Sequence, residues 1–113
     1  ALPMALREQE AVRNLLTHAS LLNAAREAPA PEVLEQAIIA RPDDLEARYR
    51  LGAARLMRND YEGALAQLLE IARRDPSFRG GAGRDGLLAL FELLGEQDAR
   101  TQRYRAELLN IAS

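Results

Sequence analysis

Neither cysteine nor lysine occurs in this sequence of 113 residues, and these absences exclude several classes of site. Without cysteine the chain has no disulfide, no thiolate nucleophile and no zinc site with cysteine ligands. No apolar run approaches the length of about 18 residues that a membrane-spanning helix requires, and the N-terminus lacks a secretory signal pattern. The formal net charge is only -2, without the cationic excess of a nucleic-acid-binding face. We therefore expect neither a nucleic acid nor a membrane as a partner.

Alanine and leucine dominate what is present, with 41 residues between them, whereas aromatic residues make up only 4%. This composition favours helices, and apolar residues recur with helical spacing along almost the whole chain. Prolines and glycines separate the periodic segments. We predict a single all-α domain over residues 1–113, with helices over 5–27, 31–40, 45–58, 61–74 and 85–94 and a last helix capped by Asp98.

Each predicted helix has an apolar side that we expect to face the core. In the first helix this stripe consists of Val12, Leu15, Leu16, Ala19 and Leu22. In the second helix we expect Val33 and Leu34 to point inward. The segment 77–83 contains three glycines, but it lacks the ending of a phosphate-binding loop and no strand precedes it, so we predict a plain interhelical loop.

Two prolines, Pro42 and Pro76, lie 34 residues apart, and each closes a predicted helix pair. This spacing equals the length of a tetratricopeptide (TPR) repeat. Residues 45–78 fit the repeat pattern most clearly, with small residues at Gly52 and Ala64 where two helices are expected to cross closely.

The segments on either side, 5–42 and 82–112, fit the repeat weakly and are predicted to be degenerate helix pairs. Within the central repeat, Arg48 occupies a position where the pattern prefers tryptophan. Because a single repeat cannot bury its apolar face alone, we expect the flanking pairs to complete a short superhelical stack of TPR-like antiparallel helix pairs.

Several motifs carry a narrower resemblance. They are Pro42-Asp43-Asp44-Leu45-Glu46-Ala47-Arg48-Tyr49, Glu62-Gly63-Ala64-Leu65, Leu68-Leu69-Glu70-Ile71, Leu87-Leu88, Phe91-Glu92-Leu93-Leu94-Gly95 and Arg103-Tyr104-Arg105. Together they resemble the C-terminal TPR-like domain of thioredoxin-fold co-chaperones, the chaperedoxin or YbbN-like family. The resemblance implies a cytoplasmic holdase that protects unfolding proteins under stress and delivers them to a chaperonin or an Hsp70-type chaperone. It also implies that this chain is the C-terminal part of a longer protein, whose N-terminal thioredoxin-like domain holds any redox chemistry.

The positions that face the concave groove of such repeats are the first candidate binding site. They include Tyr49, Leu56 and Met57, which are apolar or aromatic. Two interpretations remain open for these three residues. They form a hydrophobic docking surface for an unfolded client or a helix, or they are buried against the first helix.

The last helix is the second candidate. Arg100, Arg103 and Arg105 are predicted to surround Tyr104, and arginines beside an aromatic ring are favoured at protein interfaces. We take Arg103 and Tyr104 as candidate contacts to a chaperone. The other interpretation is a helix that caps the stack and presents a solvated basic face.

The sequence offers no catalytic constellation, no metal site and no cofactor motif. His18 lies on a helical face without other ligands, and Asp43 with Asp44 precedes a helix, where carboxylates usually act as caps. We therefore predict a non-catalytic protein-interaction module. The alternative is a structural assembly module that self-associates as a homo-oligomer or docks its own missing domain.

Overall fold

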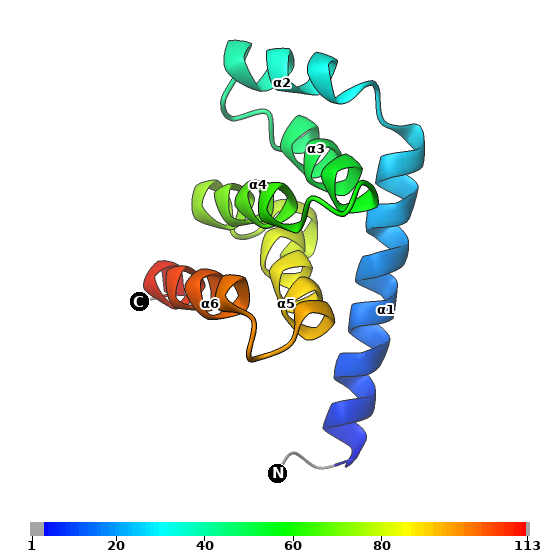
Figure 1. Cartoon of the computed structure of the whole chain (residues 1–113), viewed down its shortest axis with the longest axis vertical. Coiled ribbons are helices and arrows are strands. Elements are labelled where there is room, and N and C mark those ends of the chain that lie inside the picture. Colours follow the sequence, from blue (N-terminus) through cyan, green and yellow to red (C-terminus); the bar gives the residue numbers. More distant parts are fainter. Residues whose placement is uncertain (1–3, 113) are drawn as a thin grey trace.

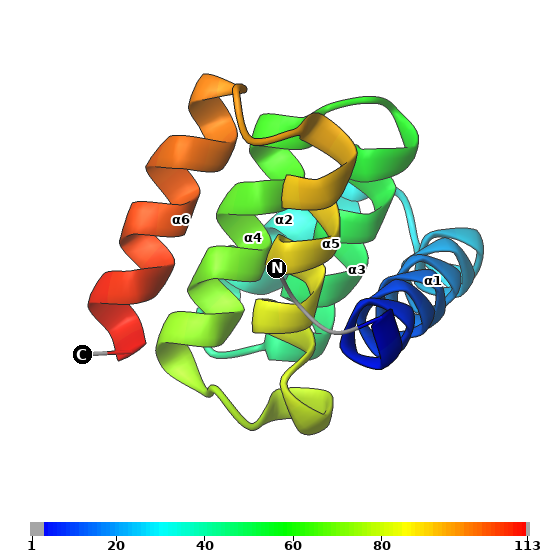
Figure 2. The ribbon, with the colours of Figure 1, turned by 90° about the horizontal axis from the view of Figure 1, so that it is seen from below.

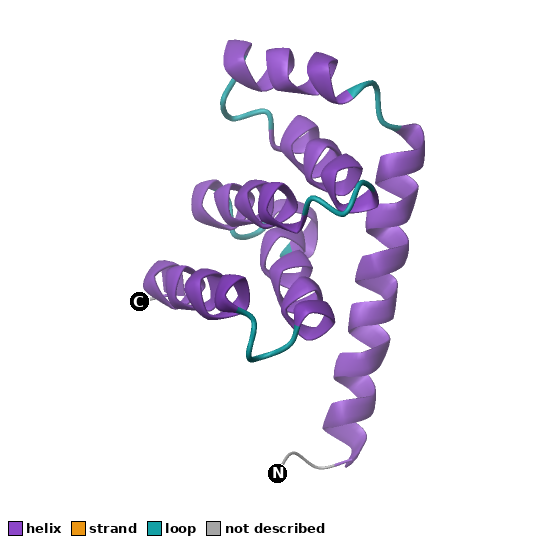
Figure 3. Ribbon diagram, viewed as in Figure 1, coloured by secondary structure: helices purple, strands orange, loops and turns teal. Residues whose placement is uncertain are grey.

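The computed structural model describes residues 4–112, and the expected domain of residues 1–113 extends beyond this range at both ends. The described part consists of six α-helices and a short 3₁₀ turn, and contains no strand (Figure 3). The elements are α1 (Met4–Glu27), α2 (Pro31–Ala40), α3 (Leu45–Met57), α4 (Tyr61–Arg74), η1 (Phe78–Gly80), α5 (Ala82–Leu94) and α6 (Ala99–Ala112). The predicted all-α fold is confirmed, and the helix ends agree within one residue except at the start of α5.

The helices lie in layers, as Figures 1 and 2 show from two directions. Helices α4 and α6 form one layer, and α3 and α5 form the next. Helix α1 lies across α3 and α5 on the side away from α4 and α6, and α2 packs on α3 at one end of the stack. Helix α1 therefore covers the face of α3 and α5 that it meets.

Aspartate side chains fix where the central helices begin. Asp44 accepts a hydrogen bond from the backbone N–H of Ala47 at 3.1 Å, and Asp60 accepts one from that of Gly63 at 2.9 Å. Asn59, before Asp60, adopts the left-handed conformation with φ of 62°, as the turn requires. These contacts are local in sequence, which explains why the ends of α3 and α4 could be predicted.

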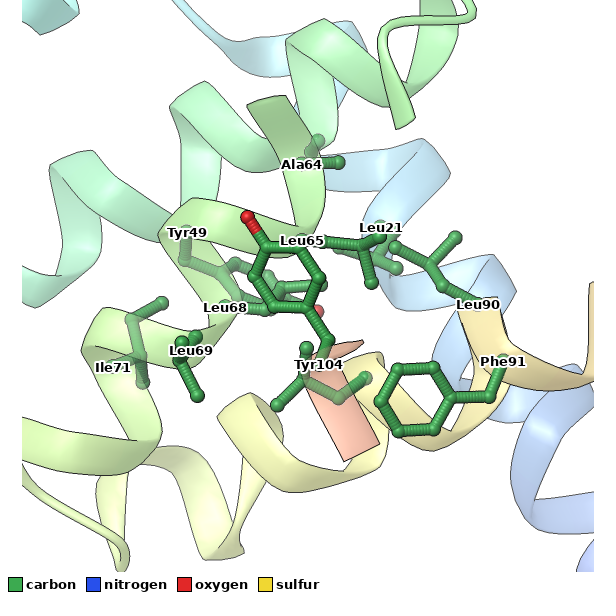
Figure 4. Packing of buried hydrophobic residues seen from close by; sticks show 12 residues of the cluster. Leu21, Tyr49, Ala64, Leu65, Leu68, Leu69, Ile71, Leu90, Phe91 and Tyr104 are labelled. Carbon is green, nitrogen blue, oxygen red and sulfur yellow. The ribbon is translucent and has the colours of Figure 1, made fainter. Parts of the chain in front are cut away.

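One large core cluster joins five of the helices, and Figure 4 shows its packing. Its buried members are Leu21, Tyr49, Ala53, Ala64, Leu65, Leu68, Leu69, Ile71, Leu87, Leu90, Phe91 and Tyr104. Five of the twelve belong to α4, more than to any other helix, and α4 also contacts α3, α5 and α6, so α4 is the central element of the stack. A smaller cluster of Leu34, Ala47 and Leu51 attaches α2 to α3.

Arg48 is buried at the position where the repeat pattern prefers tryptophan. Its Nε donates a hydrogen bond to the carbonyl oxygen of Pro42 at 2.8 Å, and its Nη1 donates one to Oε1 of Gln67 at 3.0 Å. Burial lowers the pKa of the guanidinium, and the nearby positive charge of Arg74 adds to this effect. The arginine thus ties the α2–α3 loop to α4 with hydrogen bonds where a large ring would act by packing alone.

The prediction for the inner side of α1 is wrong. Val12, Leu15, Leu16 and Leu22 are 54%, 69%, 67% and 46% exposed, and Ala19 is exposed as well. The one large apolar residue of α1 in the core is Leu21, at 1% exposure. Val33 of α2, also expected inside, is exposed.

Small and polar side chains instead decide which side of α1 meets α3 and α5. The hydroxyl groups of Ser20 and Tyr49 form a hydrogen bond of 2.7 Å, and the amide of Asn14 donates to the carboxylate of Glu92. The apolar stripe correctly indicated a helix, but periodicity alone does not specify which neighbour an apolar side will meet.

Helix α5 begins three residues earlier than predicted, so the last glycine of the 77–83 segment lies inside a helix. Gly80 and Gly81 form the turn, with φ of 68° and 98°. Gly83 has a different role, because a Cβ atom there would lie 2.7 Å from the backbone nitrogen of Ala72. The glycine therefore allows the start of α5 to approach the backbone of α4.

Substituting Gly83 with alanine should destabilise the fold by about 2 kcal/mol, because the added methyl group meets backbone atoms that cannot move aside. The matched control is Gly52→Ala, whose Cβ finds its nearest neighbour, the Cβ of Gln67, at 3.4 Å. Alanine there should be neutral or stabilise the helix by up to about 1 kcal/mol. Urea unfolding measures both values, and equal effects at the two positions would contradict the assigned packing.

Candidate functional site

The isolated ionisable residues considered from the sequence, His18, Asp43 and Asp44, lie at different places in the fold. Within residues 4–112 no group of three or more His, Cys, Asp or Glu side chains is placed to hold a metal ion. No helix of this range is long and apolar enough to cross a membrane. Asp43 forms an ion pair with Arg74 at 2.6 Å and Asp44 caps α3, so both carboxylates have structural partners. His18 is half-buried in a shallow depression between α1 and α5.

Tyr49 cannot belong to an open docking surface, because it is only 2% exposed. Its hydroxyl is bonded to Ser20 of α1, and its ring meets the ring of Phe78 edge-on at a centroid distance of 6.3 Å. The guanidinium of Arg79 lies 4.9 Å from the centre of the same ring. Of the two interpretations left open by the sequence, burial against the first helix is the one that applies to Tyr49.

Leu56 and Met57 differ from each other although they are neighbours in the chain. Leu56 is half-buried and packs against the main core cluster, whereas Met57 is 55% exposed. Met57 lies at the C-terminal end of α3, beside the elbow where α1 turns into α2. Of the three residues, Met57 is therefore the one to which the interpretation of an open apolar surface still applies.

Met57 borders a hollow of about 470 Å³ at this elbow, here called the elbow hollow. It is lined by Leu22, Ala25, Arg26, Ala28, Pro29, Ala30, Pro31, Ala54, Met57 and Arg58. Pro29 and Pro31 fix the path of the α1–α2 connection and have no backbone N–H groups that need a partner. Together with the alanines, Leu22 and Met57 they make the floor of the elbow hollow predominantly apolar. Its proline residues were visible in the sequence as a helix break, but nothing there showed that Met57 would face them.

Two arginines, Arg26 and Arg58, stand at the edge of the elbow hollow, and both are exposed. Neither forms an ion pair with another residue of the described range. The hollow thus combines an apolar floor with unpaired positive charge, a combination that suits an apolar segment carrying a nearby carboxylate.

The arginines of α6 do not gather around Tyr104 as predicted. Arg103 alone stacks on its ring, at 5.2 Å from the centroid, whereas Arg100 stacks on Tyr61 and Arg105 on Phe91. Each of the three also forms an ion pair with an acidic side chain. These partners are Asp98 for Arg100, Glu62 for Arg103 and Glu96 for Arg105. Most of this basic set therefore holds α6 to its neighbours.

Tyr104 is likewise buried, at 9% exposure, and its hydroxyl donates a hydrogen bond to Glu62 at 3.4 Å. Burial raises the pKa of this phenol, and the carboxylate of Glu62 raises it further. The ring of Tyr104 therefore belongs to the core, and a contact between this residue and a chaperone stays a prediction. Arg103 remains accessible, because its side chain is 56% exposed.

The match to known proteins agrees with this architecture. A family model described as tetratricopeptide repeat matches residues 24–111, which is more than half of the chain. Comparisons with curated proteins and with solved structures give no match. The matched range begins at the C-terminal end of α1, so most of this helix precedes the family pattern.

Asp98 provides a pH-dependent contribution to the attachment of α6. Its carboxylate accepts hydrogen bonds from the side chain and the backbone N–H of Arg100, and these lower its pKa from 3.8 to about 2. Because the pKa of Asp98 is lower in the folded chain than in the unfolded chain, the ionised carboxylate stabilises the fold at any pH above the ordinary pKa. This stabilisation is lost as the pH falls from about 4 towards 2 and the carboxylate becomes protonated.

We expect Asp98→Asn to lower the thermal unfolding midpoint at pH 6, with a difference from the unsubstituted chain that shrinks as the pH approaches 2. Asparagine still caps a helix, so the loss reports the charge rather than the cap. Thermal unfolding followed by circular dichroism at pH 6, 4 and 2.5 measures the difference, and a constant difference would contradict the role of the carboxylate.

Proposed function

The chain belongs to the tetratricopeptide repeat family, and we propose that it serves as the client-holding module of a thioredoxin-like co-chaperone. Domains of this family are protein-interaction modules. The narrower role is supported by the motifs from Pro42 to Arg105 that resemble the C-terminal domain of the chaperedoxin or YbbN-like proteins. It implies work in the cytoplasm beside a chaperonin or an Hsp70-type chaperone.

The observation that carries the proposal is the elbow hollow with Met57 at its edge. Unfolding proteins expose apolar side chains of varied shape, and a flexible thioether adapts to many of them. Arg26 and Arg58 add positive charge that attracts acidic residues flanking an apolar segment. The covered face of α3 and α5 offers no comparable surface, because α1 already occupies it.

The expected chaperone contact on α6 rests on Arg103. Its guanidinium is held by stacking on Tyr104 and by the ion pair with Glu62, and its outer edge stays in water. A partner carboxylate can approach this edge without displacing the core. The alternative function, self-association, is favoured by a different surface, the outward side of α1.

Met57→Ser should weaken client holding about tenfold, because it removes one apolar contact from the hollow. The measurement is the concentration of this chain that halves the aggregation of a reduced, unfolded reporter protein. Helicity should be unchanged, because Met57 is more than half exposed.

The matched control is Ile39→Ser, which removes an even more exposed apolar side chain, 71% exposed, from α2 outside the hollow. It should leave client holding unchanged. Equal losses in the two variants would indicate general surface hydrophobicity, and no loss with Met57→Ser would contradict the proposed site.

A further inference from the structure

The outward side of α1 is an apolar surface that the described residues leave without a neighbour. It carries Val12, Leu15, Leu16, Ala19 and Leu22, all exposed, and Leu93 of α5 extends it beside Leu15. Monomeric proteins seldom leave such a continuous patch in water. Helix α1 forms an outer edge of the molecule in both ribbon views, so another helix can reach this side (Figures 1 and 2).

The spacing of the patch residues is that of a coiled-coil seam. Residues that follow one another at intervals of four and three positions in turn lie on one line along a helix. The residues at these positions are Glu8, Val12, Leu15, Ala19, Leu22 and Arg26. The four central positions are apolar, and the seam closes with an acidic residue at one end and a basic residue at the other.

The charges at the two ends identify the partner. Glu8 and Arg26 are exposed, and neither forms an ion pair with any residue of the range 4–112. Consider a second copy of α1 that packs antiparallel on the seam. Each layer of this pair then consists of one seam residue from each copy, and the numbers of the two residues add up to 34. The layers are Glu8 with Arg26, Val12 with Leu22, and Leu15 with Ala19, each occurring twice.

Each of these layers is complementary. Opposite charges meet at both ends, and the large Leu15 faces the small Ala19 where the helices cross the twofold axis. A parallel arrangement instead places Glu8 against Glu8 and Arg26 against Arg26, which is repulsive. From the self-complementary seam we infer that the chain forms a twofold-symmetric dimer through antiparallel pairing of α1.

The seam is about 27 Å long, since it spans 18 steps of about 1.5 Å. The dimer seam and the client-holding site share Leu22 and Arg26, which also border the elbow hollow, whereas Met57 lies outside the seam and Glu8 lies outside the hollow. Met57→Ser changes the hollow alone and Glu8→Arg changes α1 alone, so failure of one proposal is distinguishable from failure of the other.

Sedimentation equilibrium of the full chain, up to several hundred micromolar, tests the dimer. Glu8→Arg and Arg26→Glu should each weaken dimerisation about tenfold, because two attractive pairs become repulsive. An equimolar mixture of these two variants should regain the affinity of the unsubstituted chain, and so should the double variant. The control Glu32→Arg makes the same charge change on α2 and should have no effect.

A chain that stays monomeric over this range would overturn the proposal and leave the seam to another occupant, such as a further domain. Single variants that dimerise as well as the unsubstituted chain would overturn the antiparallel register. The three charge changes lie at exposed positions, so circular dichroism should show unchanged helicity.

Disulfide trapping tests the register independently, since the chain has no cysteine to interfere. In the antiparallel pair Val12 meets Leu22, whereas the two copies of Val12 are separated by ten residues of helix, or about 15 Å. A mixture of Val12→Cys and Leu22→Cys should therefore form a cross-linked heterodimer under mild oxidation. Cross-linking of either variant with itself to the same extent would contradict the pairing, because a disulfide requires Cα atoms within about 7 Å.

Discussion

The contact of α1 with Tyr49 is the interaction on which the arrangement of the whole surface depends. The hydroxyl of Tyr49 is bonded to Ser20, and Leu21, the next residue of α1, enters the main core. The turn before α5 closes on the same ring through Phe78 and Arg79. One buried phenol thus holds α1, α3 and η1 together, and a buried hydroxyl needs this partner because its desolvation is otherwise unfavourable.

Two consequences follow from the way α1 is held. The groove side of α3 and α5 is filled by the chain's own helix, so binding surfaces lie at the margins of the fold. One margin is the elbow hollow around Met57, and the other is the outward seam of α1. Both combine apolar side chains with unpaired charge, which is the chemistry of surfaces that exchange water for a protein partner. The basic residues of α6, in contrast, are mostly used within the fold.

Features that depend on residues close together in the sequence could be predicted, whereas features that depend on contacts between distant residues could not. Asp44 and Asp98 cap helices as the sequence indicated, and Asp60 does the same at the start of α4, because a cap involves residues only two or three positions apart. Gly52 lies against α4 at the expected crossing of α3 and α4, whereas the tighter approach of α5 to α4 at Gly83 was not predicted, because it depends on how two helices meet. For Tyr49 and Tyr104 the sequence left both a surface and a buried position open, and both are core residues for the same reason. Met57 and Arg103 remain accessible, which neither residue type nor spacing could establish.

The sequence by itself determined the helical class, the helix ends, the 34-residue unit and the absence of thiol chemistry. These properties depend on composition, on capping residues and on periodicity, which all act within a few turns of chain. Only the tertiary structure decided which side of α1 faces inward. That choice came from Ser20, Leu21 and Asn14 meeting partners 28 to 78 positions away, against the larger apolar area of the opposite side. Residues close in sequence specify that a helix forms, but the contacts with other helices fix its rotation about its own axis.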